Sequence, residues 1–130
     1  MSFLEEVIDY IETAGIATFG TNMFATNYSS LAPDECLLVL DSPGGEPYIE
    51  VPVTHPSIQV IARANDYPVA HAKALLAYNL FHGPSKHNYR IGSYYVLVSH
   101  AMQTPGGIGR DTKGREEVSV NFSFKIEEGR

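Results

Sequence analysis

Apolar and polar residues alternate most regularly over residues 118–127, near the C-terminal end of the sequence. A period of two over ten residues predicts a strand that is buried on one face. Residues 94–98 are aromatic and β-branched and predict a strand before it. We therefore expect a long C-terminal β-hairpin, whose tip is the glycine-rich segment 103–115. The apolar positions of the last strand are Val118, Val120, Phe122, Phe124 and Ile126.

The first helical pattern covers residues 3–14, where apolar residues recur with the period of an amphipathic helix. Ser2 precedes it as a suitable N-cap, and Gly15 follows as a suitable terminator. The acidic residues at its start complement the helix dipole.

A second helix is predicted after Asp66, which can cap it, with Pro68 in the first turn. Gly83 and Pro84 mark its end. We expect one apolar stripe of this helix to face the core, made of Val69, Ala72, Leu76 and Leu80 and extended by Ala77 and Phe81.

The remaining segments predict short strands without helical crossovers between most of them. Residues 16–31 have no clear period and predict an irregular strand or a loop. Residues 36–40 are continuously apolar, as in a strand buried on both faces. A turn is expected at residues 41–46. Further strands are expected at residues 48–53, at an edge, and at 58–63 and 89–91.

These elements predict a single α+β domain over residues 1–130, with two layers: a mostly antiparallel sheet and two helices packed on one of its faces. The net charge of −6 argues against a protein that binds nucleic acid by neutralising phosphates. Cys36 is the single cysteine, which excludes an intrachain disulfide. Without a basic signal sequence or a long apolar run, we expect no membrane segment and synthesis in the cytoplasm.

The predicted hairpin tip carries three of the nine lysines and arginines. Residues 111–114 fit a type I turn that ends in a left-handed glycine, so we expect Arg110 and Arg115 to face each other and the tip to overhang the sheet. Arg110, Asp111, Lys113 and Arg115 are the candidate residues for a protein interface. The alternative is a solvated tip whose charges serve solubility.

A phosphate-binding loop is disfavoured at this tip. Arg115 and Glu116 occupy the positions where a P-loop needs Lys and Ser or Thr, and a strand follows instead of a helix. Thr112 stands where the dinucleotide-binding pattern needs its third glycine.

The histidines and the cysteine give no pattern typical of a catalytic, metal or cofactor site. His71 and His82 would lie about 16 Å apart along a helix, which is too far to share a metal ion. His100 falls on the apolar side of its strand and is expected to be a core histidine. Burial of Cys36 in an apolar run should raise its pKa. We expect no catalytic residue and no cofactor.

Several segments, taken in order, resemble the tailed-bacteriophage minor capsid proteins that act as tail terminators or head–tail joining proteins. The resemblance covers nearly the whole chain and rests on the order of turn and strand patterns. These segments are residues 3–11, 15–20, 41–47, 55–60, 109–115 and 117–122.

This resemblance implies a structural virion protein of the tail or neck, made in the host cytoplasm. Such proteins form a ring of their own copies, typically a hexamer, which caps the tail tube and docks it to the head completion or connector protein. DNA would pass through the ring without specific binding. Two other classes stay open on the residues alone: a small-molecule-binding or enzymatic α+β domain with a pocket near His100 or Cys36, and a monomeric protein-binding adaptor.

Overall fold

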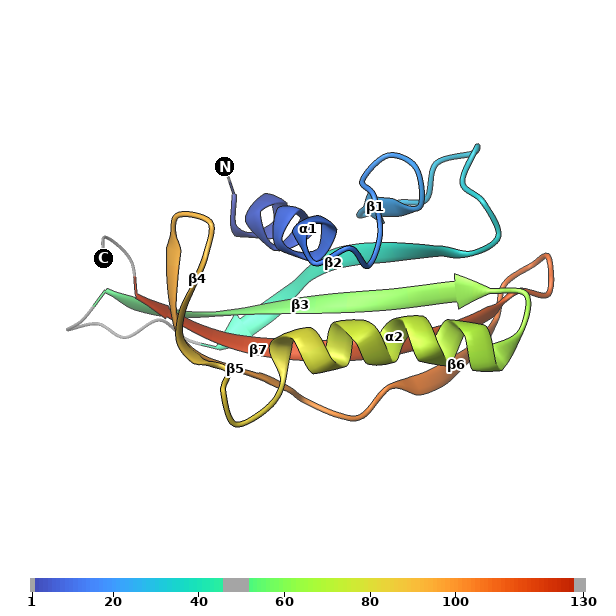
Figure 1. Ribbon diagram of the computed structural model, residues 1–130. Helices are drawn as coiled ribbons and strands as arrows, with labels where there is room; N and C mark the ends of the chain where they lie inside the picture. Colours follow the sequence, from blue (N-terminus) through green and yellow to red (C-terminus); the bar gives the residue numbers. More distant parts are fainter. Residues whose placement is uncertain (1, 46–51, 128–130) are drawn as a thin grey trace.

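One curled sheet, formed by strands from the whole length of the chain, organises the structure, a computed structural model that describes residues 2–45 and 52–127 (Figure 1). The helices are α1 (Phe3–Thr13) and α2 (Tyr67–Phe81). The strands are β1 (Met23–Ala25), β2 (Cys36–Gly45), β3 (Val53–Ala64), β4 (His87–Ile91), β5 (Tyr94–Ala101), β6 (Gly106–Arg110) and β7 (Glu116–Glu127).

The sheet has the order β1-β2-β3-β7-β5-β4, with β6 also paired to β7. The β1–β2 pair is parallel, and the other pairs are antiparallel. β7 pairs with β3 on one side along almost its whole length. On its other side it pairs first with β6, over residues 116–119, and then with β5, over residues 122–127. The result is the expected combination of helices with a mostly antiparallel sheet, which is mixed because of β1.

Both helices bury side chains in one hydrophobic cluster on a single face of the sheet. Figure 1 shows α2 running along β3 and β7, with α1 close to β2. Alternate residues of β3 and β7 point into this cluster, as the period of two predicts. The helical members are Val7, Ile8 and Ile11 of α1 and Ala70, Ala74, Ala77 and Phe81 of α2.

The N-terminal helix agrees with its prediction. Its capping box is complete: the Ser2 hydroxyl accepts from the Glu5 backbone N–H at 3.3 Å, and the Glu5 carboxylate accepts from the Ser2 backbone N–H at 3.1 Å. This arrangement satisfies N–H groups that the first turn of a helix cannot pair internally.

β2 is buried on both faces, as its apolar run predicts. Leu37 and Val39 belong to the main cluster, while Cys36 and Leu38 form a smaller cluster on the other face with Phe24. Phe24 lies in β1, the short strand within the segment whose pattern is irregular.

The turn expected at residues 41–46 is wrong where the structure describes it, because β2 continues to Gly45. Asp41 and Ser42 still pair with β3, and an irregularity in the register follows Ser42. Gly44 is required there, since a Cβ atom at this position would collide with the backbone carbonyl of His55. Most of the strand expected at residues 48–53 lies outside the described residues, and its last residue opens β3.

The stripe of α2 that faces the sheet differs from the prediction. Ala77 and Phe81 are buried as expected, but Val69 is 40% exposed and Leu76 is 51% exposed. Alanine side chains let the helix backbone approach the sheet closely, so the small residues take the inner face. The fully buried residues of α2 are Ala70, Ala74, Ala77 and Phe81.

The prediction that His100 is a core residue is also wrong. A register irregularity between Val96 and Val98 reverses the alternation along β5. Ser99 is consequently buried and His100 exposed. A bulge of this kind adds one residue to a strand and so moves the following side chains to the opposite face.

Candidate interaction site

The turn predicted at residues 111–114 is present. The Gly114 N–H donates to the Asp111 carbonyl at 3.0 Å, and Gly114 has φ 78°, a left-handed conformation that glycine adopts without strain. The Asp111 carboxylate accepts from the backbone N–H groups of Lys113 at 3.0 Å and Arg115 at 2.9 Å. Asp111 thus fixes the turn with its side chain as well as its backbone.

The expectation that Arg110 and Arg115 face each other is wrong by one residue. The Asp111 N–H donates to the Arg115 carbonyl, so Asp111 and Arg115 close the turn. Arg110 therefore pairs with Glu116, and its Nε lies 2.7 Å from the Glu116 carboxylate. The Arg110 side chain remains 70% exposed.

Arg115 ties the tip to the body of the protein. Its side chain is 13% exposed, donates from Nε to Asp111 at 2.7 Å, and lies 3.2 Å from Asp34 through a terminal nitrogen. Asp34 precedes β2, far from the tip in sequence. The tip is consequently anchored at its base, and the free overhang that the residues suggested is limited to the turn itself.

These contacts lower the pKa values of both aspartates. Hydrogen bonds from the Asn65 side chain and then from Arg115 hold the pKa of Asp34 below its usual value. Burial opposes ionisation of Asp111, but its hydrogen bonds from the Arg115 backbone and side chain outweigh burial and lower its pKa. Both groups therefore favour the ionised form, which keeps the anchor charged.

Arg63 lies at the centre of this site, although the sequence pattern did not indicate it. It is 4% exposed, its guanidinium lies 4.1 Å from the centre of the Tyr28 ring, and it donates to the carbonyls of Pro33 at 2.7 Å and Asp34 at 3.3 Å. It also lies 4.0 Å from the Asp111 carboxylate. These partners are distant in sequence, and the only local signal was an arginine inside an apolar strand pattern.

Tyr28 completes the buried part of the site. Its hydroxyl donates to the Glu117 carboxylate at 3.0 Å. Burial and then the nearby Glu117 charge raise the pKa of Tyr28, so the phenol stays protonated. Between this layer and the turn lies a hollow of about 380 Å³, which Lys113 also lines.

The four candidate residues thus divide into two pairs. Asp111 and Arg115 are mostly buried and shape the turn, whereas Arg110 and Lys113 present positive charge to the solvent. The arrangement can attract a negatively charged surface, because exposed charges steer and orient a partner.

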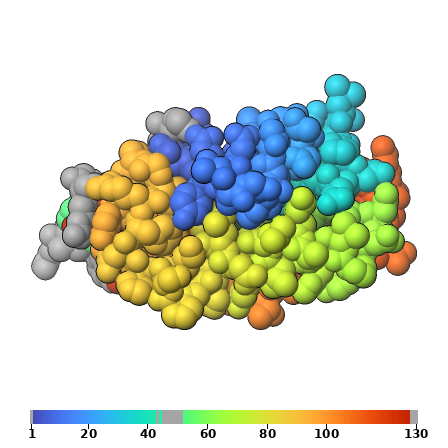
Figure 2. Space-filling view, in the orientation of Figure 1, coloured from blue at the N-terminus to red at the C-terminus, as the bar shows by residue number. Residues whose placement is uncertain are grey.

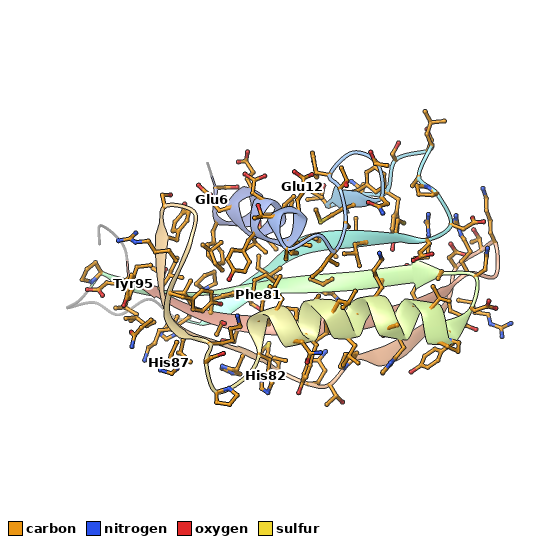
Figure 3. All side chains as sticks on the ribbon, in the orientation of Figure 1. Glu6, Glu12, Phe81, His82, His87 and Tyr95 are labelled. Carbon is orange, nitrogen blue, oxygen red and sulfur yellow. The ribbon has the colours of Figure 1, made fainter. Side chains whose placement is uncertain are left out.

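His82 and Cys36, two other side chains with potential chemistry, have structural roles. The Nδ1 atom of His82 accepts from the Ala101 N–H at 3.0 Å, and its ring packs on Tyr78; Figure 3 shows His82 at the end of α2. Cys36 is fully buried, and burial raises the pKa of its thiol. Within residues 2–45 and 52–127, no three His, Cys, Asp or Glu side chains are grouped as metal ligands. Neither of the described helices is long and apolar enough to span a membrane.

Comparison with known proteins gives two findings. The family model of the bacteriophage tail terminator protein matches residues 10–128. A chain in the solved structure of the virion of a native gene transfer agent particle has the same fold, with a TM-score of 0.70 over 97% of this chain and 95% of that chain. The two sequences are 9% identical, so this likeness concerns the fold. No curated protein matches the sequence.

Proposed function

Because the chain belongs to the bacteriophage tail terminator family, we propose that it forms a ring that caps the tail tube and docks the tube to the head completion or connector protein. The observation that carries this proposal is the family match over residues 10–128. The fold shared with a chain of a virion supports it. The family is a structural one, which agrees with a role in assembly rather than catalysis.

The exposed basic residues of the tip suit a contact within this assembly. Arg110 and Lys113 are positively charged side chains on a chain with a net charge of −6. Each copy therefore carries a small positive patch at the tip and an excess of negative charge overall. A ring built head to tail brings two different surfaces of neighbouring copies together. The tip then meets an acidic surface on a neighbouring copy or on the next ring of the particle. DNA passes the ring without specific binding, since the acidic chain repels phosphates.

Deletion of the gene in the phage that encodes the chain tests the proposed function. Electron microscopy of the lysate should show tail tubes of uncontrolled length and heads without attached tails. Expression of the wild-type chain from a plasmid should restore joined particles. Tails of normal length joined to heads in the deletion strain would contradict the function.

A charge-reversal variant tests the role of the tip. Arg110→Glu with Lys113→Glu should leave the fold intact, because neither side chain is buried and the exposed ion pair between Arg110 and Glu116 contributes at most about 1 kcal/mol. The variant should reduce the yield of infectious particles at least about tenfold. The control is Arg110→Lys with Lys113→Arg, which keeps both charges. Arg115 is unsuitable for this test because its loss would disturb the turn. Equal yields from the two variants would refute a contact through these charges.

A further inference from the structure

The outward face of α2 is apolar although nothing within the described residues covers it. Val69 is 40% exposed, Leu75 38% and Leu76 51%. Next to these side chains is the α2 hollow, a depression of about 350 Å³. Its walls are mainly apolar, and its lining residues are Glu35, Pro68, Val69, Ala72, Lys73 and Leu76.

The charged groups beside the α2 hollow are already engaged within the chain. The Lys73 ammonium donates to the Ile16 carbonyl at 3.0 Å and lies 3.9 Å from the Glu35 carboxylate. An apolar group that enters the hollow therefore leaves no lysine without a partner. An unpaired buried charge would otherwise oppose such a contact strongly.

The same chain carries an apolar side chain that projects into solvent. Leu31 is 90% exposed, more than any other large apolar residue described. It lies in the segment before β2, which protrudes from the body in Figure 2. The Ser29 hydroxyl accepts from the Leu31 N–H at 3.2 Å, and the Ser29 carbonyl accepts from the Ala32 N–H at 3.0 Å. These bonds hold Leu31 in its projecting position, and residues 29–33 carry no charge.

We propose that Leu31 of one copy inserts into the α2 hollow of the next copy, and that this contact repeats around the ring. The partner is a second copy of this chain because the chain supplies both complementary surfaces, an uncharged projection and an apolar hollow. In a ring this contact is heterologous, because Leu31 of each copy meets the α2 hollow of the next copy until the ring closes. This inference rests on the proposed function for the existence of a ring.

Cysteine cross-linking tests the contact directly. Leu31→Cys and Leu76→Cys are prepared as separate proteins with tags of different size, mixed at high concentration and oxidised mildly. The native Cys36 does not interfere because it is fully buried. The contact predicts a disulfide between the two variants, since disulfides need Cα atoms within about 7 Å. Each variant oxidised alone should give little dimer.

The matched control is Phe19→Cys, at a position that is 52% exposed and outside both surfaces, mixed with Leu76→Cys. The same mixtures are also co-expressed during phage production and oxidised in purified particles, where the ring is assembled. The proposal is overturned if the disulfide between Leu31→Cys and Leu76→Cys is no more abundant than in this control, both in the mixed proteins and in the particles. Dimers of Leu76→Cys alone, or its linkage to a different virion protein, overturn it as well.

The location of the chain in wild-type particles distinguishes failure of this inference from failure of the proposed function. If the chain is found at the head-proximal end of wild-type tails and the cysteine pair does not link, only the contact is wrong. If the chain is absent from tails, the function itself is wrong. In support of the contact, Leu31→Ser should weaken self-association about tenfold or more without changing the unfolding midpoint.

Discussion

The two helices contribute to the same buried cluster but distribute their apolar residues differently. α1 buries Val7, Ile8 and Ile11 and turns acidic residues outward. α2 is apolar nearly all round, buries its alanines and Phe81, and leaves larger aliphatic side chains exposed. An apolar pattern at helical spacing therefore marks the inner face only when the other face is polar. In α2, where both faces are apolar, the face that carries Ala70, Ala74 and Ala77 packs on the sheet, with Phe81 at its C-terminal end.

The largest difference between the two faces of α2 is expected for truncation of a large side chain. Phe81, which Figure 3 labels, is fully buried. Its ring centre lies 5.2 Å from that of Phe122 and 5.5 Å from that of Phe124. Phe81→Ala should lower the free energy of unfolding by about 3–5 kcal/mol. Leu76→Ala should change it by less than about 0.5 kcal/mol. Urea denaturation measures both, and similar losses would show that Leu76 is part of the core.

Replacing an alanine of α2 by a larger residue should have the second largest effect on stability. Ala74 is fully buried and Ala72 is exposed on the same helix. Ala74→Leu should cost about 1–3 kcal/mol because the added atoms have no space. Ala72→Leu, the matched control, should leave the unfolding free energy within about 0.5 kcal/mol. If Ala74→Leu is tolerated equally well, the close approach of α2 to the sheet is not required.

The helix caps provide a smaller contrast. Ser2 makes a side-chain cap bond in α1, whereas Asp66 makes none in α2. Ser2→Ala should destabilise the protein by about 0.5–2 kcal/mol. Asp66→Ala should have a smaller effect, because no side-chain hydrogen bond is lost. Thermal unfolding measures the stability of both variants. An equal loss of stability in the two would contradict the difference in capping.

The smallest expected effect is the pH dependence of the α1 cap. The Ser2 backbone N–H, and then its hydroxyl, lowers the pKa of Glu5 below its ordinary value of 4.5. A carboxyl whose pKa is lower in the folded state stabilises the fold above its unfolded pKa, and this contribution disappears as the pH falls through the lowered value. The stability difference between wild type and Glu5→Gln should therefore be constant near neutral pH and shrink below pH 4.5. If this stability difference grows on acidification, the pKa of Glu5 is raised in the folded state and not lowered.

Local patterns in the sequence predicted the features that depend on neighbouring residues. The cap at Ser2, the strand period of residues 118–127 and the turn at residues 111–114 all follow from interactions within a few positions. The fold class and family resemblance could also be predicted, because they depend on the order of such elements.

Contacts between distant segments could not be predicted in this way. Arg63 meets Tyr28 and Asp34 only after β3 has paired with β2, and Arg115 reaches Asp34 only after β7 has joined β3. The bulge that exposes His100 depends on the pairing of β5 with β7. The sequence therefore indicated which tip residues are charged, but not that Arg115 anchors the tip while Arg110 and Lys113 remain exposed.

The position of β7 in the sheet has a consequence for synthesis on the ribosome. β7 is translated after all the other described strands, yet β3, β5 and β6 all pair with it. Until it emerges, β3 lacks a partner on one edge, and Phe81 lacks the Phe122 and Phe124 rings against which it packs. Contacts over such sequence separations form slowly. One edge of β3 and the ring of Phe81 therefore gain their native partners only after residues 116–127 have left the exit tunnel.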